Sequence, residues 1–167
     1  MKVAVLGSGG REHAIVWKLS QSQKIKELFC LPGNPGIKQL AKCVPLPLHN
    51  HQSLIHWAKK EAISLTVVGP EDPLSNGIVD SFLAAGLQIY GPNQKAAQLE
   101  SSKTFAKQIM KIYGVPTAKS ASFTELGPAL SYVKENGAPI VIKADGLAAG
   151  KGVTVATSVV EAETSLR

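Results

Sequence analysis

The sequence predicts an α/β protein in which an open, mostly parallel sheet is followed by a smaller, incomplete α+β unit. Short apolar segments alternate with helical segments over the first hundred residues, and this alternation is typical of parallel strands joined by helices. Glycine-rich turns follow several of these strands. After Gly91-Pro92 two helical segments stand together, so a second unit begins nearby. We therefore expect one domain over residues 1–101 and an incomplete second domain over residues 102–167.

Five short, mainly apolar segments are the expected strands of the first domain, and the first of them is a β-branched run. They cover residues 2–6, 26–31, 43–46, 65–68 and 87–90. The segments between them carry apolar residues on one helical face, which predicts helices over 11–21, 53–62 and from about 78 to a stop at Gly86. Because ligands of open parallel sheets bind at the carboxyl ends of the strands, the loops after the strands are the expected binding sites.

The second domain combines helices with a glycine-rich hairpin. Its expected helices cover 96–99, 102–113 and 128–136, and its expected strands cover 120–123, 140–143 and 153–156. Ser158 and Glu161 form a capping box that opens one more helix. No stop signal closes that helix, and two or three strands cannot cover both faces of the unit. We therefore expect the second unit to be cut rather than finished.

Composition excludes several classes of protein. With 44% hydrophobic and 18% charged residues, the 167-residue chain is neither disordered nor collagen-like, and Cys30 and Cys43 read as free thiols in apolar stretches. The net charge of +6 comes from scattered lysines, with no run longer than Lys59-Lys60, so we expect no nucleic-acid partner. The apolar run at the N-terminus is too short for a signal peptide or a membrane span, which predicts a cytoplasmic protein without membrane contact.

The first glycine loop is a candidate phosphate site. Gly9, Gly10, Arg11 and Glu12 lie between a strand and a helix, where backbone N–H groups and the helix dipole attract anions. The spacing approaches that of dinucleotide-binding loops. However, Glu12 stands where the third glycine belongs, and no acidic residue ends the second strand. The loop therefore favours a simpler phosphorylated ligand over NAD.

Two further loops end strands at the same edge of the expected sheet. One contains Gly33 and Asn34, and the other contains Gly69, Pro70 and Glu71. A carboxylate such as Glu71 can accept hydrogen bonds from an amine or from ribose hydroxyls. Because three loops meet at one edge, we expect a single binding site there.

The hairpin of the second domain carries a loop that suits a triphosphate. Its residues are Gly146, Leu147, Ala148, Ala149, Gly150, Lys151 and Gly152. The spacing differs from a Walker A motif, and the loop precedes a strand, so we expect a flap that lays backbone N–H groups over phosphates. Lys143 on the incoming strand and Lys151 in the flap bring positive charge. The four histidines have no Cys or acidic neighbours at metal-ligand spacing, so we expect no metal site.

Six segments together resemble the glycinamide ribonucleotide synthetase (phosphoribosylamine-glycine ligase) family. They are VLGSGGREHAIVWK, LPGNPG, TVVGPEDPL, GIVDSFLAAG, QLESSKTFAK and APIVIKADGLAAGKGV. The resemblance implies a Rossmann-like domain preceding an ATP-grasp domain that is only partly present, so we expect the chain to be an N-terminal fragment that is inactive alone. It also implies ligation of glycine to 5-phosphoribosylamine in purine biosynthesis, with ATP converted to ADP and phosphate.

The resemblance also implies roles for individual residues. The three loops of the first domain would hold phosphoribosylamine, and Lys103 and Lys143 would contact ATP phosphates beneath the loop from Gly146 to Gly152. The family uses magnesium or manganese, whose ligands are expected outside this chain, and no catalytic residue is assigned within it. Small-molecule substrates are the expected partners, and a monomer is favoured. The alternative is a non-catalytic module that binds a phosphosugar or nucleotide; an NAD-dependent oxidoreductase is motivated only by the first glycine turn.

Overall fold

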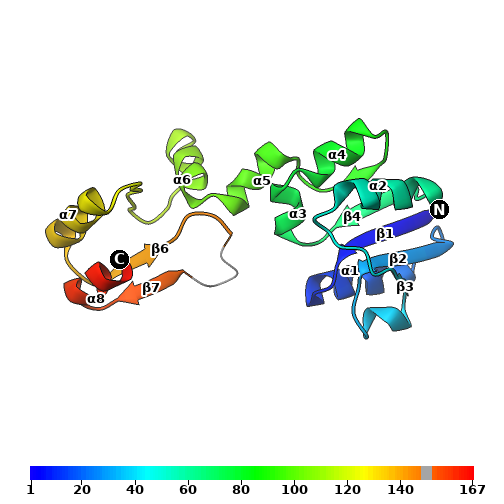
Figure 1. The fold of residues 1–167 in the computed structure, drawn as a ribbon, viewed down its shortest axis with the longest axis horizontal. Helices are drawn as coiled ribbons and strands as arrows, with labels where there is room; N and C mark the ends of the chain where they lie inside the picture. The colour runs from blue at the N-terminus through cyan, green and yellow to red at the C-terminus, as the bar shows by residue number, and fades with distance from the viewer. Residues whose placement is uncertain (148–151) are drawn as a thin grey trace. The chain divides into compact units, whose positions relative to one another are not determined.

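A computed structural model describes residues 1–147 and 152–167, and it divides the chain into two compact units, Met1–Gln98 and Leu99–Arg167 (Figure 1). The helix α5 (Gln94–Ser101) runs from the first unit into the second. Each unit has its own sheet and its own apolar core. The two units are therefore described separately.

The first unit contains a five-stranded parallel sheet, which confirms the predicted fold class. Its strands are β1 (Lys2–Gly7), β2 (Glu27–Pro32), β3 (Lys42–Cys43), β4 (Leu65–Val68) and β5 (Ile89–Tyr90), in the order β3-β2-β1-β4-β5. Gly7 pairs with Pro32, and Leu6 pairs with Val68. The central strand β1 and its two neighbours therefore end at the same edge of the sheet.

Helices cover both faces of this sheet. They are α1 (Gly10–Ser20), the 3-10 turn η1 (Ile37–Gln39), α2 (His51–Lys60), α3 (Glu71–Ser75) and α4 (Ile78–Ala84). Alternate residues of β1 point to opposite faces, as a strand requires. Val3 and Val5 pack in one core with Val16 of α1, whereas Ala4 and Leu6 pack in the other with residues of α2 and α4.

Two segments of the first unit differ from the prediction. The strand expected over 43–46 stops at Cys43, because Pro45 and Pro47 have no N–H to donate to a sheet. The turn expected after Gly69 contains α3 instead. Its N-cap is Pro70 with extended backbone, and Glu71 and Asp72 in the first turn complement the helix dipole.

The second unit joins helices to an antiparallel hairpin, as the sequence predicts. Its elements are α6 (Lys103–Ile112), α7 (Leu126–Asn136), β6 (Ile140–Lys143), β7 (Val153–Ala156) and α8 (Val159–Ser165). Val133, Ala156 and Ala162 form its buried apolar cluster, whereas no residue of α6 is fully buried. Half of the predicted capping box of α8 forms: the Ser158 hydroxyl accepts from the Glu161 N–H at 3.2 Å, but the Glu161 carboxylate accepts from the N–H of Thr157, at 2.8 Å, rather than from that of Ser158.

The strand expected over residues 120–123 is wrong. These residues have no strand structure, and β6 and β7 are the strands of the sheet in the described part of this unit. A strand needs a hydrogen-bonded neighbour, and the segment instead contacts α6 through side chains. The Thr104 hydroxyl donates to the Ser122 hydroxyl at 3.2 Å.

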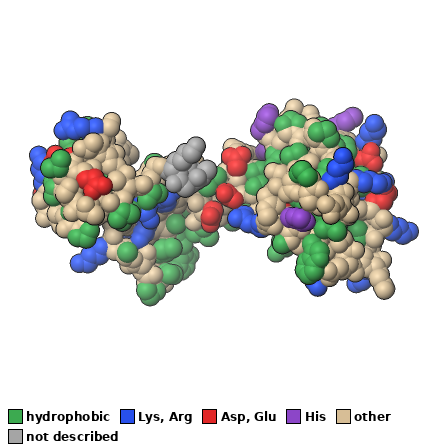
Figure 2. Space-filling model, turned by 90° about the horizontal axis from the view of Figure 1, so that it is seen from below, with side chains coloured by type: hydrophobic (Ala, Val, Ile, Leu, Met, Phe, Trp, Pro, Cys, Tyr) green, Lys and Arg blue, Asp and Glu red, His purple; other side chains and the backbone are tan. Residues whose placement is uncertain are grey.

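Positive charge is spread over the surface rather than gathered in one stripe. Figure 2 shows Lys and Arg side chains dispersed over the face drawn. At one end of the sheet, Lys2 and Lys42 approach the two carboxylate oxygens of Glu27 at 3.1 and 2.6 Å. Hydrogen bonds from Lys42 and Lys2 lower the pKa of Glu27. Within residues 1–147 and 152–167, no helix has the length and apolar character needed to cross a membrane.

Candidate functional site

The three predicted loops of the first unit lie side by side at the edge where β1, β2 and β4 end. The Gly33 N–H donates to the carbonyl of Gly7 at 3.1 Å, and the Gly69 N–H donates to the carbonyl of Leu6 at 3.0 Å. These hydrogen bonds extend the pairing of the strands into the loops. Hence the sheet itself brings the loops together.

Glu12 is buried at the centre of this edge. Its side chain is only 4% exposed, and one carboxylate oxygen accepts from the Gly9 N–H at 2.6 Å. Gly7, Gly9 and Gly69 surround it so closely that a methyl group on any of them would collide with the Glu12 side chain. Only residues without a side chain fit around this carboxylate.

Arg11 connects the first loop to the third. Its guanidinium donates to the carbonyl of Gly69 at 2.7 Å and to the carboxylate of Glu71 at 3.3 Å. The side chains of Arg11 and Glu71 are 64% and 45% exposed, so both remain accessible to a ligand. Arg11 supplies positive charge beside the N-terminus of α1. Without it, the negative charge of Glu12 would disfavour a phosphate there.

Asn34 connects the first loop to the second. Its side-chain amide donates to the carbonyl of Ser8 at 2.8 Å and accepts from the N–H of Ile37 at 2.9 Å. The ring of His13 lies against Gly36 in the same loop, where a Cβ atom would stand 2.7 Å from it. The predicted site residues thus hold the three loops in a fixed arrangement.

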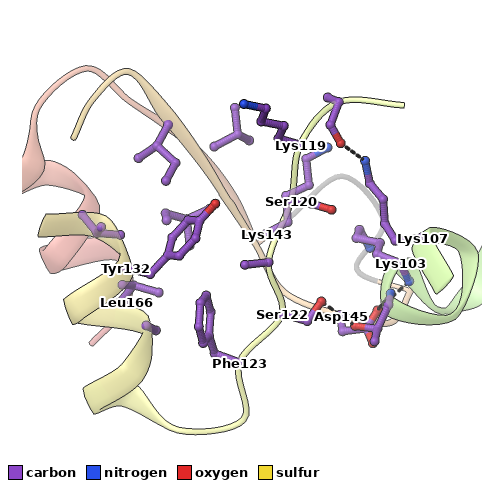
Figure 3. Close-up of a pocket in the computed structure, with 18 of the residues that line it drawn as sticks. Lys103, Lys107, Lys119, Ser120, Ser122, Phe123, Tyr132, Lys143, Asp145 and Leu166 are labelled. Atoms are coloured by element: carbon purple, nitrogen blue, oxygen red, sulfur yellow. Dashed lines mark hydrogen bonds between the residues drawn. The ribbon is translucent and has the colours of Figure 1, made fainter. Parts of the chain in front are cut away.

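The second unit contains a cavity of about 930 Å³ that brings four lysines together. They are Lys103 and Lys107 from α6, Lys119 from the following segment and Lys143 from β6. Figure 3 shows these lysines and, across the cavity from them, Phe123 and Tyr132. The two aromatic rings are 5.3 Å apart and tilted by 52°. A cavity with cationic and apolar parts suits a ligand that carries both phosphates and an apolar group.

Lys103 and Asp145 meet beside this cavity. The Lys103 ammonium donates to the carbonyl of Gly146 at 2.7 Å, while the Lys103 backbone N–H donates to the carboxylate of Asp145 at 2.6 Å. Burial raises the pKa of Asp145, but hydrogen bonds from the N–H groups of Lys103, Gly146 and Thr104 outweigh it and lower that pKa overall. Asp145 is therefore a carboxylate at neutral pH.

Lys107 plays a different part in the cavity wall. Its ammonium donates to the Thr117 hydroxyl at 2.7 Å and to the carbonyl of Ala118 at 2.8 Å. These bonds tie the segment after α6 back to the helix. Lys107 was not among the predicted site residues, although its four-residue spacing from Lys103 places both on one helical face.

The structure describes only part of the predicted flap. Lys143 ends β6 opposite Val153 of β7, Leu147 is 41% exposed, and Gly152 has a φ of +70°, which favours glycine. The predicted contacts at Ala148, Ala149, Gly150 and Lys151 lie outside the described residues. Sequence reasoning also missed Lys119 and Asp145. No periodic pattern marks either residue, because each acts through contacts that only the folded unit creates.

Metal ligands do not gather in the described part of the chain: no group of three or more His, Cys, Asp or Glu side chains could hold an ion there. Cys30 and Cys43 are both free thiols, as predicted. Burial raises the pKa of Cys30 to about 12, with smaller contributions from Cys43 and Glu12. That thiol is therefore protonated and unreactive at neutral pH.

Sequence profiles of known protein families match the whole chain in two consecutive parts. The sequence profile described as "Phosphoribosylglycinamide synthetase, N domain" matches residues 1–100, and the profile described as "Phosphoribosylglycinamide synthetase, ATP-grasp (A) domain" matches residues 101–167. The phosphoribosylamine-glycine ligase of Xanthomonas campestris is 55% identical over 100% of this chain, and that of Neisseria meningitidis is 55% identical over 99%.

Solved structures give the same result. The crystal structure of phosphoribosylamine-glycine ligase from Thermotoga maritima matches 98% of this chain with a TM-score of 0.76 and 35% identity, and the match covers 38% of that protein. Carboxyaminoimidazole ribonucleotide synthase from Aspergillus clavatus, solved in complex with ATP, shares the fold at a TM-score of 0.75 and 22% identity. The chain spans 39% of the length of the Xanthomonas and Neisseria relatives. By its sequence and its fold, the chain belongs to the phosphoribosylglycinamide synthetase family.

Proposed function

We propose that this chain supplies the phosphoribosylamine site and part of the ATP site of a phosphoribosylamine-glycine ligase of purine biosynthesis. In this reaction the γ-phosphoryl group of ATP passes to the carboxylate of glycine. The amine of 5-phosphoribosylamine then displaces the phosphate to form an amide bond. The products are glycinamide ribonucleotide, ADP and phosphate. We assign residues 1–101 to the substrate domain and residues 102–167 to the ATP-grasp domain.

The observation that carries this proposal is the joining of three loops at one edge of the parallel sheet. At the start of α1, Gly10 presents a backbone N–H group, while that of Gly9 is taken by the carboxylate of Glu12, and the exposed guanidinium of Arg11 lies beside them. We assign the ligand's phosphate to this corner. The exposed carboxylate of Glu71, 3.3 Å from Arg11, is placed to accept from an amine or a ribose hydroxyl.

The remaining loop residues form the walls of the same site. Gly33 and Pro70 set the course of the second and third loops, and Asn34 and Gly69 hold these loops to the first. The buried carboxylate of Glu12 fixes the turn at Gly9. A site whose polar groups are held before the ligand arrives loses less entropy on binding.

We assign the phosphates of ATP to the cavity of the second unit. Lys103 and Lys143 line it and would neutralise the charge that shifts during phosphoryl transfer. Gly146, Leu147 and Gly152 belong to the flap beside them, and Lys119 adds a further positive charge. Mg²⁺ or Mn²⁺ would bring further positive charge to these phosphates. We assign it no ligands among the described residues, and we place the protein in the cytoplasm as a monomer.

Ligand binding to the first unit tests the substrate assignment. The probes are glycinamide ribonucleotide and ribose 5-phosphate, added to the 167-residue chain during thermal or urea unfolding. A ligand at a hundred times its Kd adds about 2.7 kcal/mol to the free energy of unfolding. We expect both probes to stabilise the chain. We expect Arg11→Ala to raise the Kd of both probes about tenfold, because it removes a charged contact to the phosphate.

A matched control is Lys18→Ala, which removes a cation from the last turn of the same helix, away from the three loops. It should leave the Kd of both probes unchanged. If neither probe stabilises the chain, the substrate assignment is wrong. If the probes bind but a ligase that contains this chain releases no ADP with glycine and phosphoribosylamine, the chain is a binding module rather than part of an enzyme.

A further inference from the structure

The carboxylate of Asp145 joins the end of the β6 segment to the first turn of α6. One oxygen accepts from the backbone N–H groups of Lys103 at 2.6 Å, Gly146 at 3.0 Å and Thr104 at 3.4 Å. The other accepts from the hydroxyl of Ser102 at 3.1 Å. A single side chain thus connects segments that lie more than forty residues apart in the sequence.

This junction fixes Lys103 at both of its ends. Asp145 holds its backbone N–H, and the neighbouring carbonyl of Gly146 accepts from its ammonium group at 2.7 Å. Gly146 has a φ of +93°, a conformation that favours glycine. The position of the Lys103 ammonium therefore depends on residues 145 and 146, which follow Lys143 closely in the chain.

The charges are arranged so that Lys103 stays available to an anion. Its ammonium donates to a neutral carbonyl, whereas the carboxylate of Asp145 is occupied by N–H and O–H donors. A helix cap alone does not explain this arrangement, because α6 already has one. The Ser102 hydroxyl accepts from the N–H of Phe105 at 3.1 Å.

We propose that Asp145 is a positioning residue for ATP, which sets Lys103 of α6 and Lys143 of β6 in a fixed relation around one phosphate site. This inference rests on the proposed function, because it requires that Lys103 contacts ATP. Asp145 lines the cavity, but its carboxylate oxygens are taken by N–H and O–H donors of the protein, so we assign it no contact with the phosphates. It acts through Lys103, so its loss costs ATP binding only while the Lys103 ammonium is present.

A double-mutant cycle tests this dependence. We would join residues 1–167 to the remaining part of the Xanthomonas campestris ligase and measure ADP release against ATP and glycine concentration. Lys103→Met should raise KM for ATP about tenfold, the effect of losing ~1.4 kcal/mol of phosphate contact. Asp145→Ala should raise it by a similar factor, with KM for glycine unchanged. In the double variant, KM for ATP should rise about as much as in either single variant, not by the product of the two factors.

Two further variants separate positioning from stability. Asp145→Asn keeps the shape and one acceptor for the Lys103 N–H, so it should recover most of the ATP affinity lost in Asp145→Ala. Glu161→Gln is the matched control, since Glu161 also accepts an N–H beside a helix start, from Thr157 at 2.8 Å, but lies outside the cavity lining. It should leave KM for ATP unchanged. Each variant's melting temperature is measured, and kinetics are run well below the lowest of them.

The outcomes distinguish failure of the ATP assignment from failure of the positioning role. If Lys103→Met leaves KM for ATP unchanged, the assignment of Lys103 to ATP is wrong, and the role of Asp145 falls with it. If Lys103→Met has its effect but Asp145→Ala has none, the positioning role alone is overturned. That role is also overturned if the factors multiply in the double variant, or if Glu161→Gln raises KM for ATP as Asp145→Ala does.

Discussion

At the scale of single residues, Glu12 and the glycines around it depend on one another. The carboxylate is almost fully buried, and its hydrogen bond from Gly9 offsets part of the cost of that burial. Gly7 and Gly69 approach it from the adjacent strands. The sequence pattern identified Gly9 as part of a phosphate loop and Gly69 as part of another loop at the same edge of the sheet. It did not show that one of their tasks is to make room for an acid.

Substitution of Gly69 tests this close approach. A Cβ atom at Gly69 would overlap the Glu12 side chain, so Gly69→Ala should lower the free energy of unfolding by about 1–3 kcal/mol, the usual cost of overpacking. Urea unfolding followed by circular dichroism measures the change. Gly10→Ala is the control, because nothing lies within 4 Å of its Cβ position and it begins a helix. It should be neutral or slightly stabilising. Equal losses in both variants would contradict this account.

Cys30 should resist alkylation in the folded protein. Its side chain is fully buried, its thiol donates to the carbonyl of Gly7 at 3.3 Å, and burial raises its pKa to about 12. Iodoacetamide at pH 8 should therefore leave Cys30 unmodified in the native chain and modify it after unfolding in urea. Mass spectrometry of the peptide that contains Cys30 measures the extent of alkylation in both states. Modification of Cys30 at equal rates in the two states would show that the first unit opens readily.

At the scale of elements, the start of α6 shows how a distant carboxylate can complete a helix. Ser102 caps the helix locally, while Asp145 supplies the acceptor for the N–H groups of Lys103 and Thr104. The pattern in the sequence predicts the helix well because its amphipathic spacing is local. The second acceptor could not be predicted, since it depends on how the hairpin packs.

This contact predicts a pH dependence. The pKa of folded Asp145 lies below its ordinary value of 3.8, so its stabilising effect is complete above that value and is lost as the pH falls through the lowered pKa. Asp145→Asn should cost about 1 kcal/mol at pH 7. The difference from the unmodified chain should shrink below about pH 4.

Urea unfolding of the second unit at pH 7 and pH 3 measures both differences. Ser158→Ala is the control, because its hydroxyl does not titrate and caps α8 through the Glu161 N–H without a hydrogen bond to Asp145, so its cost should be the same at both pH values. A cost of Asp145→Asn that is constant across this range would show that the charge of Asp145 does not contribute.

At the scale of the whole molecule, the sequence predicted the first unit far better than the second. The parallel sheet follows from local alternation, and the three loops follow from the rule that binding loops lie at the strand ends. The incorrect strand over 120–123 shows the limit of this reasoning. Of its residues only Phe123 favours a strand, and strand formation also depends on a neighbour that sequence periodicity cannot reveal. The cluster of four lysines was likewise only half predicted, because Lys107 and Lys119 reach it through tertiary packing.

The first unit is proposed to bind phosphoribosylamine and the second to bind ATP. This assignment predicts that the two ligands protect different parts of the chain. Glycinamide ribonucleotide should slow hydrogen exchange at the loops that contain Gly9, Asn34 and Glu71, and ATP should slow it at Lys103 and Lys143. Hydrogen exchange with mass spectrometry of the 167-residue chain measures both. Val3 to Leu6, which lie in the fully buried strand β1, serve as an internal control and should not respond to either ligand. Protection by ATP at the three loops instead would contradict the assignment.

The central position of β1 has a consequence for synthesis of the chain. β1 leaves the ribosome before β2 and β4, yet it lies between them in the sheet and supplies residues to both cores. Its second neighbour, β4, ends only at Val68. During translation the apolar side chains on both faces of β1 therefore stay uncovered until several dozen further residues have emerged. Chaperones that bind short apolar segments would find a target in β1 during this interval.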